Sequence, residues 1–236
     1  MFLKTRIDSL LKITILVGVA SVMLTACGEK SKSTSGKSNG ERSAYEVSGD
    51  HALGDPRAPI TVVEYASVTC PHCATWAKTV WPEFRTKYVD TGKVRYVFRE
   101  YPTAPLDLAT AGHLLANCAP DENFFDMIHV QFKSQRKIMF SNDIKGDYVA
   151  LAKSVGMNEA DFDACMANEK IKQHLNDVIE LGSNDGITGT PAFVINGKKK
   201  KVYVLESFDK EFAKILGENL PAIKDDTKTL AEPKNH

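Results

Sequence analysis

The sequence lacks a surplus of charge of either sign, because 30 Lys and Arg residues balance 30 Asp and Glu residues over its 236 positions. Without a basic excess there is no electrostatic case for binding nucleic acid. A long apolar run is missing as well, since the apolar stretch 13–24 near the N-terminus is too short to cross a bilayer comfortably. The composition, 43% hydrophobic and 25% charged, is ordinary for a soluble domain.

The pattern of cysteine and histidine argues against two kinds of metal centre. Cys70-Pro71-His72-Cys73 is the single Cys-x-x-Cys sequence in the chain. A c-type haem site requires a histidine directly after the second cysteine, but position 74 is alanine. A zinc site requires two further ligands at short spacing, and neither a second Cys-x-x-Cys nor a His-x-x-x-His follows. The motif is therefore either a redox-active pair or an inert structural disulfide.

The position of the motif favours redox chemistry. It follows the apolar, strand-like run Ile60 to Ser67, and Pro71 suits the first turn of a helix. Two cysteines at positions i and i+3 of a helix share one face within disulfide reach. Cys70 would lie at the positive end of the helix dipole, which stabilises a thiolate, so it attacks while Cys73 resolves. His72 is held close to this sulfur and should stabilise the thiolate further, unless it is a solvent-exposed residue without a role.

Two elements far apart in the chain carry a family resemblance. A strand with Glu64 precedes CPHC, and a second strand, Val94 to Glu100, follows the helix. Gly189-Thr190-Pro191 then stands directly before the strand-like segment 192–196. This order resembles the DsbA-like class of thioredoxin-fold disulfide oxidoreductases of the periplasm, whose usual active-site motif is CPHC.

The resemblance covers roughly residues 45–220 and implies an α/β thioredoxin fold in one domain. A helical insertion, at about residues 103–186, is expected between the second core strand and the strand that follows the cis-proline. The class more often has an aromatic residue where Thr69 stands here, and a Thr-Pro pair like Thr190-Pro191 also occurs in disulfide isomerases.

The resemblance also implies roles for three residues. Pro191 would be cis and face the active site, and with Thr190 it would bind an extended substrate segment. Glu64 would lie beneath the cysteine pair and accept or relay the proton of Cys73. A carboxylate inside an apolar strand needs such a reason when both faces of the strand are covered. The alternative is that Glu64 faces solvent by simple alternation.

The N-terminus has the pattern of an export signal. Three basic residues among the first twelve precede the apolar stretch, and the sequence LTAC that ends at Cys27 resembles the bacterial lipoprotein cleavage box. We expect residues 1–26 to be a signal peptide and Cys27 to carry lipid; an uncleaved membrane anchor is the alternative. Either places the domain in the periplasm, tethered to a membrane of undecided leaflet. We predict a flexible tether over 27–44 and a disordered tail over 221–236.

The chain has an odd number of cysteines, five in all. If Cys27 is lipidated and Cys70 pairs with Cys73, then Cys118 and Cys165 are left. In an oxidising compartment we expect these two to form a structural disulfide, and two free buried thiols are the alternative. The other histidines of the domain, His113, His129 and His174, are scattered and indicate no site.

The sequence thus predicts a thiol–disulfide oxidoreductase that introduces disulfide bonds into exported proteins. Neither a cofactor nor a metal is needed, because the two cysteines carry the electrons. The resemblance implies a DsbB-like membrane quinone reductase as the partner that reoxidises the pair. Two alternatives stay open: an isomerase or reductase kept reduced by a membrane electron donor, and a non-catalytic lipoprotein with a binding or holdase role.

Overall fold

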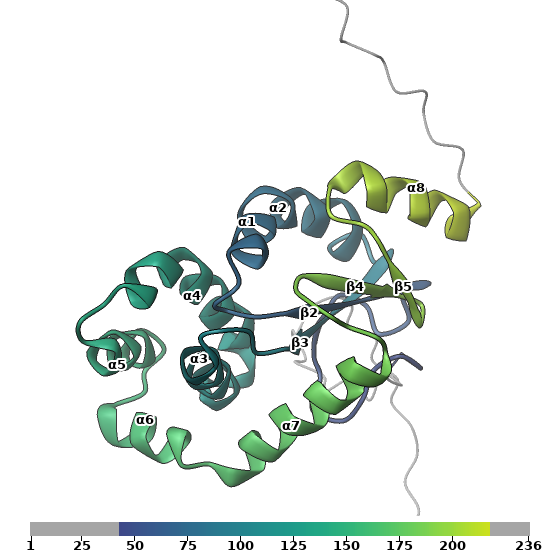
Figure 1. Ribbon diagram of the computed structural model, residues 1–236. Coiled ribbons are helices and arrows are strands. Elements are labelled where there is room, and N and C mark those ends of the chain that lie inside the picture. The colour runs from purple at the N-terminus through teal and green to yellow at the C-terminus, as the bar shows by residue number, and fades with distance from the viewer. Residues whose placement is uncertain (1–42, 218–236) are drawn as a thin grey trace, which may run out of the picture. The chain divides into compact units, whose positions relative to one another are not determined.

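The computed structural model describes residues 43–217 (Figure 1). The predicted signal peptide, the lipidation site at Cys27, nearly all of the predicted tether and the C-terminal tail lie outside the described residues. Among the residues that are described, no helix is both long enough and apolar enough to cross a membrane.

A five-stranded mixed sheet in the order β1-β3-β2-β4-β5 forms the centre of the domain. The two central strands, β2 and β3, are parallel, and every other neighbouring pair is antiparallel. All seven residues of β2 are buried, as its nearly continuous apolar sequence predicts for a strand covered on both faces. The strands are β1 (His51–Leu53), β2 (Ile60–Ala66), β3 (Val94–Glu100), β4 (Ala192–Ile195) and β5 (Lys198–Lys200).

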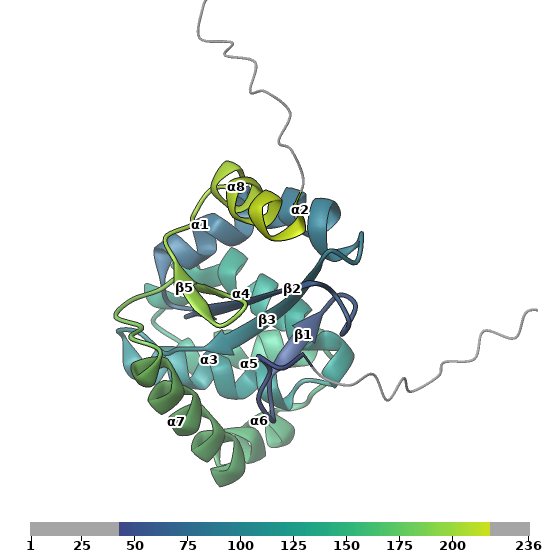
Figure 2. The ribbon, with the colours of Figure 1, turned by 90° about the vertical axis from the view of Figure 1, so that its right-hand side faces the viewer.

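Helices cover both faces of the sheet (Figures 1 and 2). On one face lie α1 (Pro71–Thr79), α2 (Trp81–Phe84), the π-helical segment η1 (Arg85–Val89) and α8 (Leu205–Leu216). The chain between β3 and β4 is helical, in agreement with the predicted insertion. It comprises α3 (Leu106–Cys118), the 3₁₀ turn η2 (Asp121–Asn123), α4 (Phe124–Met139), α5 (Ile144–Ser154), α6 (Glu159–Met166) and α7 (Glu169–Asn184).

An aromatic cluster attaches α1 to the sheet. The indole ring of Trp76 lies 5.0 Å from the ring of Phe193 on β4 and 6.3 Å from that of Tyr96 on β3, measured between centroids. Phe84 and Phe208 extend the cluster to α2 and α8. Such aromatic pairs contribute about 0.5–1.5 kcal/mol each beyond the area they bury. The cluster therefore fixes the start of α1, where the cysteine pair lies.

Two predicted elements differ in detail. The sequence pattern predicts a single helix over Pro71–Val89 with a kink at Pro82, but in the structure α1 ends at Thr79 and Pro82 lies in the first turn of α2. A proline fits there because the first turn of a helix leaves its N–H groups without intrahelical partners. The sequence Asn196-Gly197 also predicts a hairpin whose second strand spans 202–205. In the structure that strand is β5, which begins earlier because both turn residues have positive φ and reverse the chain within two residues.

Candidate active site

The cysteine pair lies where β2 passes into α1. Cys70 is the N-cap residue of α1, with an extended backbone, and Pro71 occupies the first helical position. Both cysteines are free thiols in this structure. Cys70 is 7% exposed and Cys73 is fully buried, so an incoming sulfur can reach only the first of them.

The pKa values of the two thiols are shifted in opposite directions. The pKa of Cys70 is lowered to about 5, chiefly because the Cys73 thiol donates a hydrogen bond to its sulfur. The Thr190 side chain and the backbone N–H groups of Cys73 and His72 add to this effect, and burial opposes it. Burial raises the pKa of Cys73 well above its ordinary value, and the hydrogen bond to Cys70 and the nearby charge of Glu64 raise it further. Cys70 is therefore the thiol that ionises readily, and Cys73 is the one that stays protonated.

The segment with Thr190 lies directly against Cys70. The Thr190–Pro191 peptide bond is cis, and the Cys70 thiol donates a hydrogen bond of 3.2 Å to the carbonyl oxygen of Thr190. The Thr190 hydroxyl is buried and has no other partner among the described residues, so it is free to donate to the thiolate. A second cis peptide bond, Ala104–Pro105, was not predicted from the sequence.

His72 is exposed beside the pair, and its backbone N–H points at Cys70. The stabilisation that can be traced to position 72 thus comes from its main chain, through the helix N-terminus. An effect of the imidazole on Cys70 stays a prediction.

Glu64 is buried behind the cysteine pair and does not lie on a solvent face. It is 2% exposed and accepts a hydrogen bond of 2.5 Å from the hydroxyl of Tyr96. Burial raises the pKa of Glu64 to about 8, against a lowering by the Tyr96 hydrogen bond. At neutral pH the carboxyl group is therefore mostly protonated, and it lies close enough for its charge to affect Cys73.

Several polar groups that hold the active-site loop were missed in the sequence. Gln135 on α4 donates hydrogen bonds from Nε2 to the carbonyl oxygens of Val68, at 2.8 Å, and Cys70, at 2.9 Å. The hydroxyls of Ser67 and Thr69 are 2.9 Å apart, and Thr69 also donates to the carbonyl oxygen of residue 103. Isolated polar residues on a helix or in a loop give no sequence signal of such contacts.

A cavity of about 520 Å³ lies between α1 and the segment with the cis-proline. Its lining includes His72, which lies beside the cysteine pair, and the exposed side chains of Tyr203 and Val204. Thr190 and Pro191 also line it, so the cavity continues from the active-site segment onto an apolar surface.

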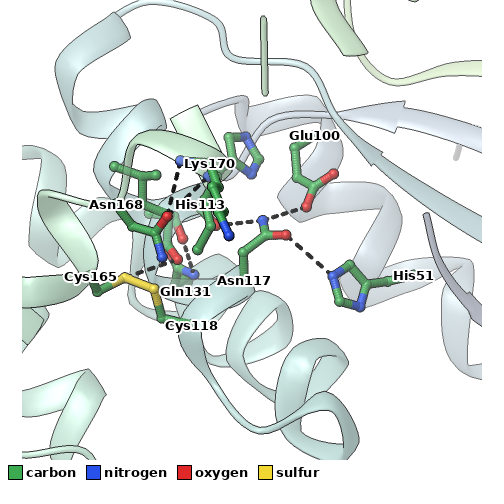
Figure 3. Close-up of a disulfide and its surroundings, with 12 residues drawn as sticks. His51, Glu100, His113, Asn117, Cys118, Gln131, Cys165, Asn168 and Lys170 are labelled. Atoms are coloured by element: carbon green, nitrogen blue, oxygen red, sulfur yellow. Dashed lines mark hydrogen bonds between the residues drawn. A yellow bond between two sulfur atoms is a disulfide. The ribbon is translucent and has the colours of Figure 1, made fainter. Parts of the chain in front are cut away.

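The remaining two cysteines are bonded to one another (Figure 3). Cys118, at the end of α3, forms a disulfide with Cys165 on α6, with the two Cα atoms 6.0 Å apart. Figure 3 also shows the neighbouring Asn117, whose amide donates to the buried carboxyl group of Glu100 at 2.7 Å. Within residues 43–217 no three His, Cys, Asp or Glu side chains gather closely enough to hold a metal ion.

Comparison with known proteins identifies the family. A family model described as thioredoxin matches residues 46–212, which include the cysteine pair and Pro191. The chain belongs to the thioredoxin family. Within it, this thioredoxin-family protein is DsbA-like. The crystal structure of alpha-DsbA1 from Wolbachia pipientis is 31% identical, with a TM-score of 0.65 over 73% of this chain and 93% of that one.

Two further relatives agree with this placement of the thioredoxin-family chain. A protein from Rickettsia bellii with the provisional name protein-disulfide oxidoreductase is 33% identical over 177 residues, 72% of this chain. The match spans 66% of that relative, just under two thirds of its length. BdbD from Bacillus subtilis has the same fold, with 21% identity and a TM-score of 0.66 over 73% of this chain and 95% of that one.

Proposed function

We propose that this DsbA-like protein is a thiol–disulfide oxidoreductase that introduces disulfide bonds into exported proteins. The observation that carries the proposal is the contrast within one pair of cysteines: a thiol with its pKa lowered to about 5 beside one with its pKa raised well above the ordinary value. Such a contrast divides the pair into one sulfur that exchanges partners and one that closes the disulfide. The names of the relatives support the reaction class.

The reaction begins with Cys70 and Cys73 joined in a disulfide. A substrate thiolate attacks the Cys70 sulfur, the bond between the cysteines breaks, and Cys73 leaves with the electron pair. Protonated Glu64 supplies a proton to the Cys73 thiolate, because the raised pKa of Cys73 favours its protonated form. A second substrate thiolate then attacks the substrate sulfur of the mixed disulfide and releases Cys70 as a thiolate. The substrate is oxidised and the protein is reduced.

The direction of electron flow follows from the stability of the reduced form. Hydrogen bonds from Cys73, Thr190 and the start of α1 stabilise the Cys70 thiolate, which exists only in the reduced protein. A stabilised reduced form makes the disulfide a strong oxidant. This favours an oxidase over an isomerase that must stay reduced.

Substrate binding is proposed for the surface that borders Cys70. The backbone beside Thr190 would pair with an extended substrate segment, in the manner of an added strand. The cavity of about 520 Å³ next to it would accept an apolar substrate side chain against Tyr203 and Val204. Only an unfolded or partly folded protein presents a cysteine in such an extended segment.

The setting of the reaction is also part of the proposal. Export by the segment 1–26 and lipid on Cys27 would hold the domain at a membrane facing the periplasm. A DsbB-like quinone reductase in that membrane would take the electrons from Cys70 and Cys73 and restore the disulfide.

Trapping the mixed disulfide tests the function. Oxidised protein is mixed with a reduced, unfolded substrate, and the products are separated without reductant. The Cys73→Ser variant is first activated by forming a mixed disulfide at Cys70. We expect it to form a stable covalent complex with the substrate, because the resolving sulfur is absent. The matched Cys70→Ser variant should form no such complex. Wild-type protein that leaves the substrate thiols unchanged would contradict an oxidase.

An equilibrium with glutathione then separates the oxidase from the isomerase. An oxidase should have a reduction potential above the value of about −180 mV that is typical of protein disulfide isomerase. A potential near that of thioredoxin, about −270 mV, would instead favour a reductase.

A further inference from the structure

A small cavity lies next to Glu64. Its volume is about 10 Å³, which is the room that one water molecule requires. Glu64 and Tyr96 line it from the sheet, Trp76 from α1, and His129 from α4. Most of the other lining side chains are apolar, among them Phe98, Phe125, Ile128 and Phe132.

The polar groups of this cavity suit a bound water. A buried water needs two to four polar partners. The Glu64 carboxyl group and the Tyr96 hydroxyl are already hydrogen-bonded to each other, and each has further capacity. The Nε1 atom of Trp76 is buried without a hydrogen-bond partner in the described part of the chain. His129 keeps one ring nitrogen available, because the ring makes a hydrogen bond to the backbone of Phe125 through the other.

His129 also borders solvent. It lines a second, open cavity of about 800 Å³, which shares Phe125 and His129 of α4 with the small one. Arg85, whose side chain is 51% exposed, and Asp126 line the same open cavity. His129 is thus a titratable side chain that lines both the small cavity beside Glu64 and the open one.

We propose that His129 passes protons between solvent and Glu64 through a water in this small cavity. This relay rests on the proposed function, since thiol exchange is what makes a proton cross the core. The need for it follows from geometry: Glu64 and Cys73 are buried and have no direct contact with solvent through which to gain or lose a proton.

Reoxidation is the step that needs the relay most. A disulfide partner first forms a mixed disulfide with Cys70, and Cys73 must then lose its proton to attack the Cys70 sulfur. Glu64 can accept that proton only after releasing its own, which passes to the water, to His129 and to solvent. The Cys70–Cys73 bond forms, the bond from Cys70 to the partner breaks, and the partner leaves as a thiolate. During substrate oxidation the proton moves inward along the same route.

The surroundings of His129 keep the ring suited to this role. Burial lowers its pKa, which keeps the imidazole neutral near pH 7 and able to accept a proton. The charges that face it are Asp126 and Lys133 on α4 and Arg85 on η1. The indole of Trp81 packs against the ring, with centroids 5.7 Å apart, and holds it in the wall between the cavities.

The test follows the resolution of a Cys70–glutathione mixed disulfide, formed by adding glutathione disulfide to the reduced protein and quenched with acid at set times. We expect His129→Phe to slow this resolution about tenfold at neutral pH, a modest share of what a positioned acid–base group contributes. In His129→Ala, where the lost ring leaves room for it, added imidazole should restore the rate, and the same addition should have no effect on His129→Phe, whose ring fills that space. His129→Gln serves the same purpose if the phenylalanine variant does not fold.

Two controls isolate the relay. His174→Phe, which alters the open cavity but not the small one beside Glu64, should leave the rate unchanged. In a Glu64→Gln background, His129→Phe should have no further effect, because the carboxyl group that exchanges protons with Cys73 is absent. If His129→Phe and His129→Gln both match an active wild type, the relay is overturned and the proposed function stands. If the wild type exchanges no disulfide at all, the proposed function fails and the relay with it.

Discussion

At the scale of single residues, the sequence predicts some members of the candidate site and gives no sign of others. The motif CPHC, with a strand before it and Thr-Pro far downstream, predicts Cys70 and Cys73 as site residues, and a glutamate inside an apolar strand predicts Glu64. The contact between Cys70 and Thr190, 120 positions apart, has no local signal and could be expected only from a family resemblance. The hydrogen bond from Tyr96 to Glu64 could not be predicted, because a tyrosine in a strand is ordinary core material.

The buried carboxyl group of Glu64 should make stability depend on pH. Its pKa is raised from 4.5 to about 8, so between these pH values the native state keeps a proton that the unfolded chain releases. Wild-type stability therefore falls as pH rises through this window, by at most about 1.4 kcal/mol per pH unit from this group. Glu64→Gln lacks the titration and should lose that part of the decline.

Denaturant unfolding of the disulfide form measures this effect, because the bonded Cys70 and Cys73 do not titrate. Between pH 4.5 and 8, the free energy of unfolding of Glu64→Gln should rise relative to that of the wild type. Parallel profiles for the two proteins would show that Glu64 has an ordinary pKa. Glu100, whose burial raises its pKa to about 7, contributes equally to both and cancels in the comparison.

At the scale of elements, the helical insertion does more than fill space beside the sheet. Its helix α4 supplies Gln135, which holds the carbonyl oxygens of Val68 and Cys70, and His129, which lines the cavity of Glu64. The existence of helices in this region could be predicted from their periodicity. Which of their faces meets the active-site loop depends on how the helices pack, and a single sequence does not contain that information.

Gln135→Met should weaken the active-site loop. The variant keeps much of the side-chain volume but removes both hydrogen bonds, which leaves two carbonyl oxygens without this donor. We expect a loss of about 1–3 kcal/mol in the free energy of unfolding and a rise in the pKa of Cys70, because the loop no longer fixes that sulfur at the helix N-terminus.

The matched control is Gln173→Met on α7, whose amide donates a hydrogen bond to the exposed Asp177. This change should cost less than about 0.5 kcal/mol. Equal effects of the two substitutions would mean that Gln135 is an ordinary surface residue.

At the scale of the whole molecule, the order of the motifs predicted the architecture well. The sheet, the insertion and the proline-bearing segment follow the thioredoxin pattern, and the cysteine count left Cys118 and Cys165 as the pair that the structure joins. The strand β1 was not predicted, since three residues carry too little periodicity. The small cavity beside Glu64 was also beyond prediction, because side chains from five separate elements line it.

The disulfide between α3 and α6 should stabilise the fold without taking part in the chemistry. It closes a loop with a sequence separation of 47, for which the chain-entropy model gives about 4 kcal/mol. Replacing Cys118 and Cys165 together by alanine should lower the free energy of unfolding by several kcal/mol. The mixed-disulfide reaction at Cys70 should proceed as before at temperatures where the variant is folded.

The most direct test of the whole account is the acidity of one sulfur. The thiolate absorbance of the reduced protein at about 240 nm is titrated against pH, with Cys70→Ser as the blank. We predict that Cys70 is half ionised near pH 5. Half ionisation near pH 8.5, the value of an ordinary free cysteine, would contradict the stabilised thiolate on which the proposed oxidase depends.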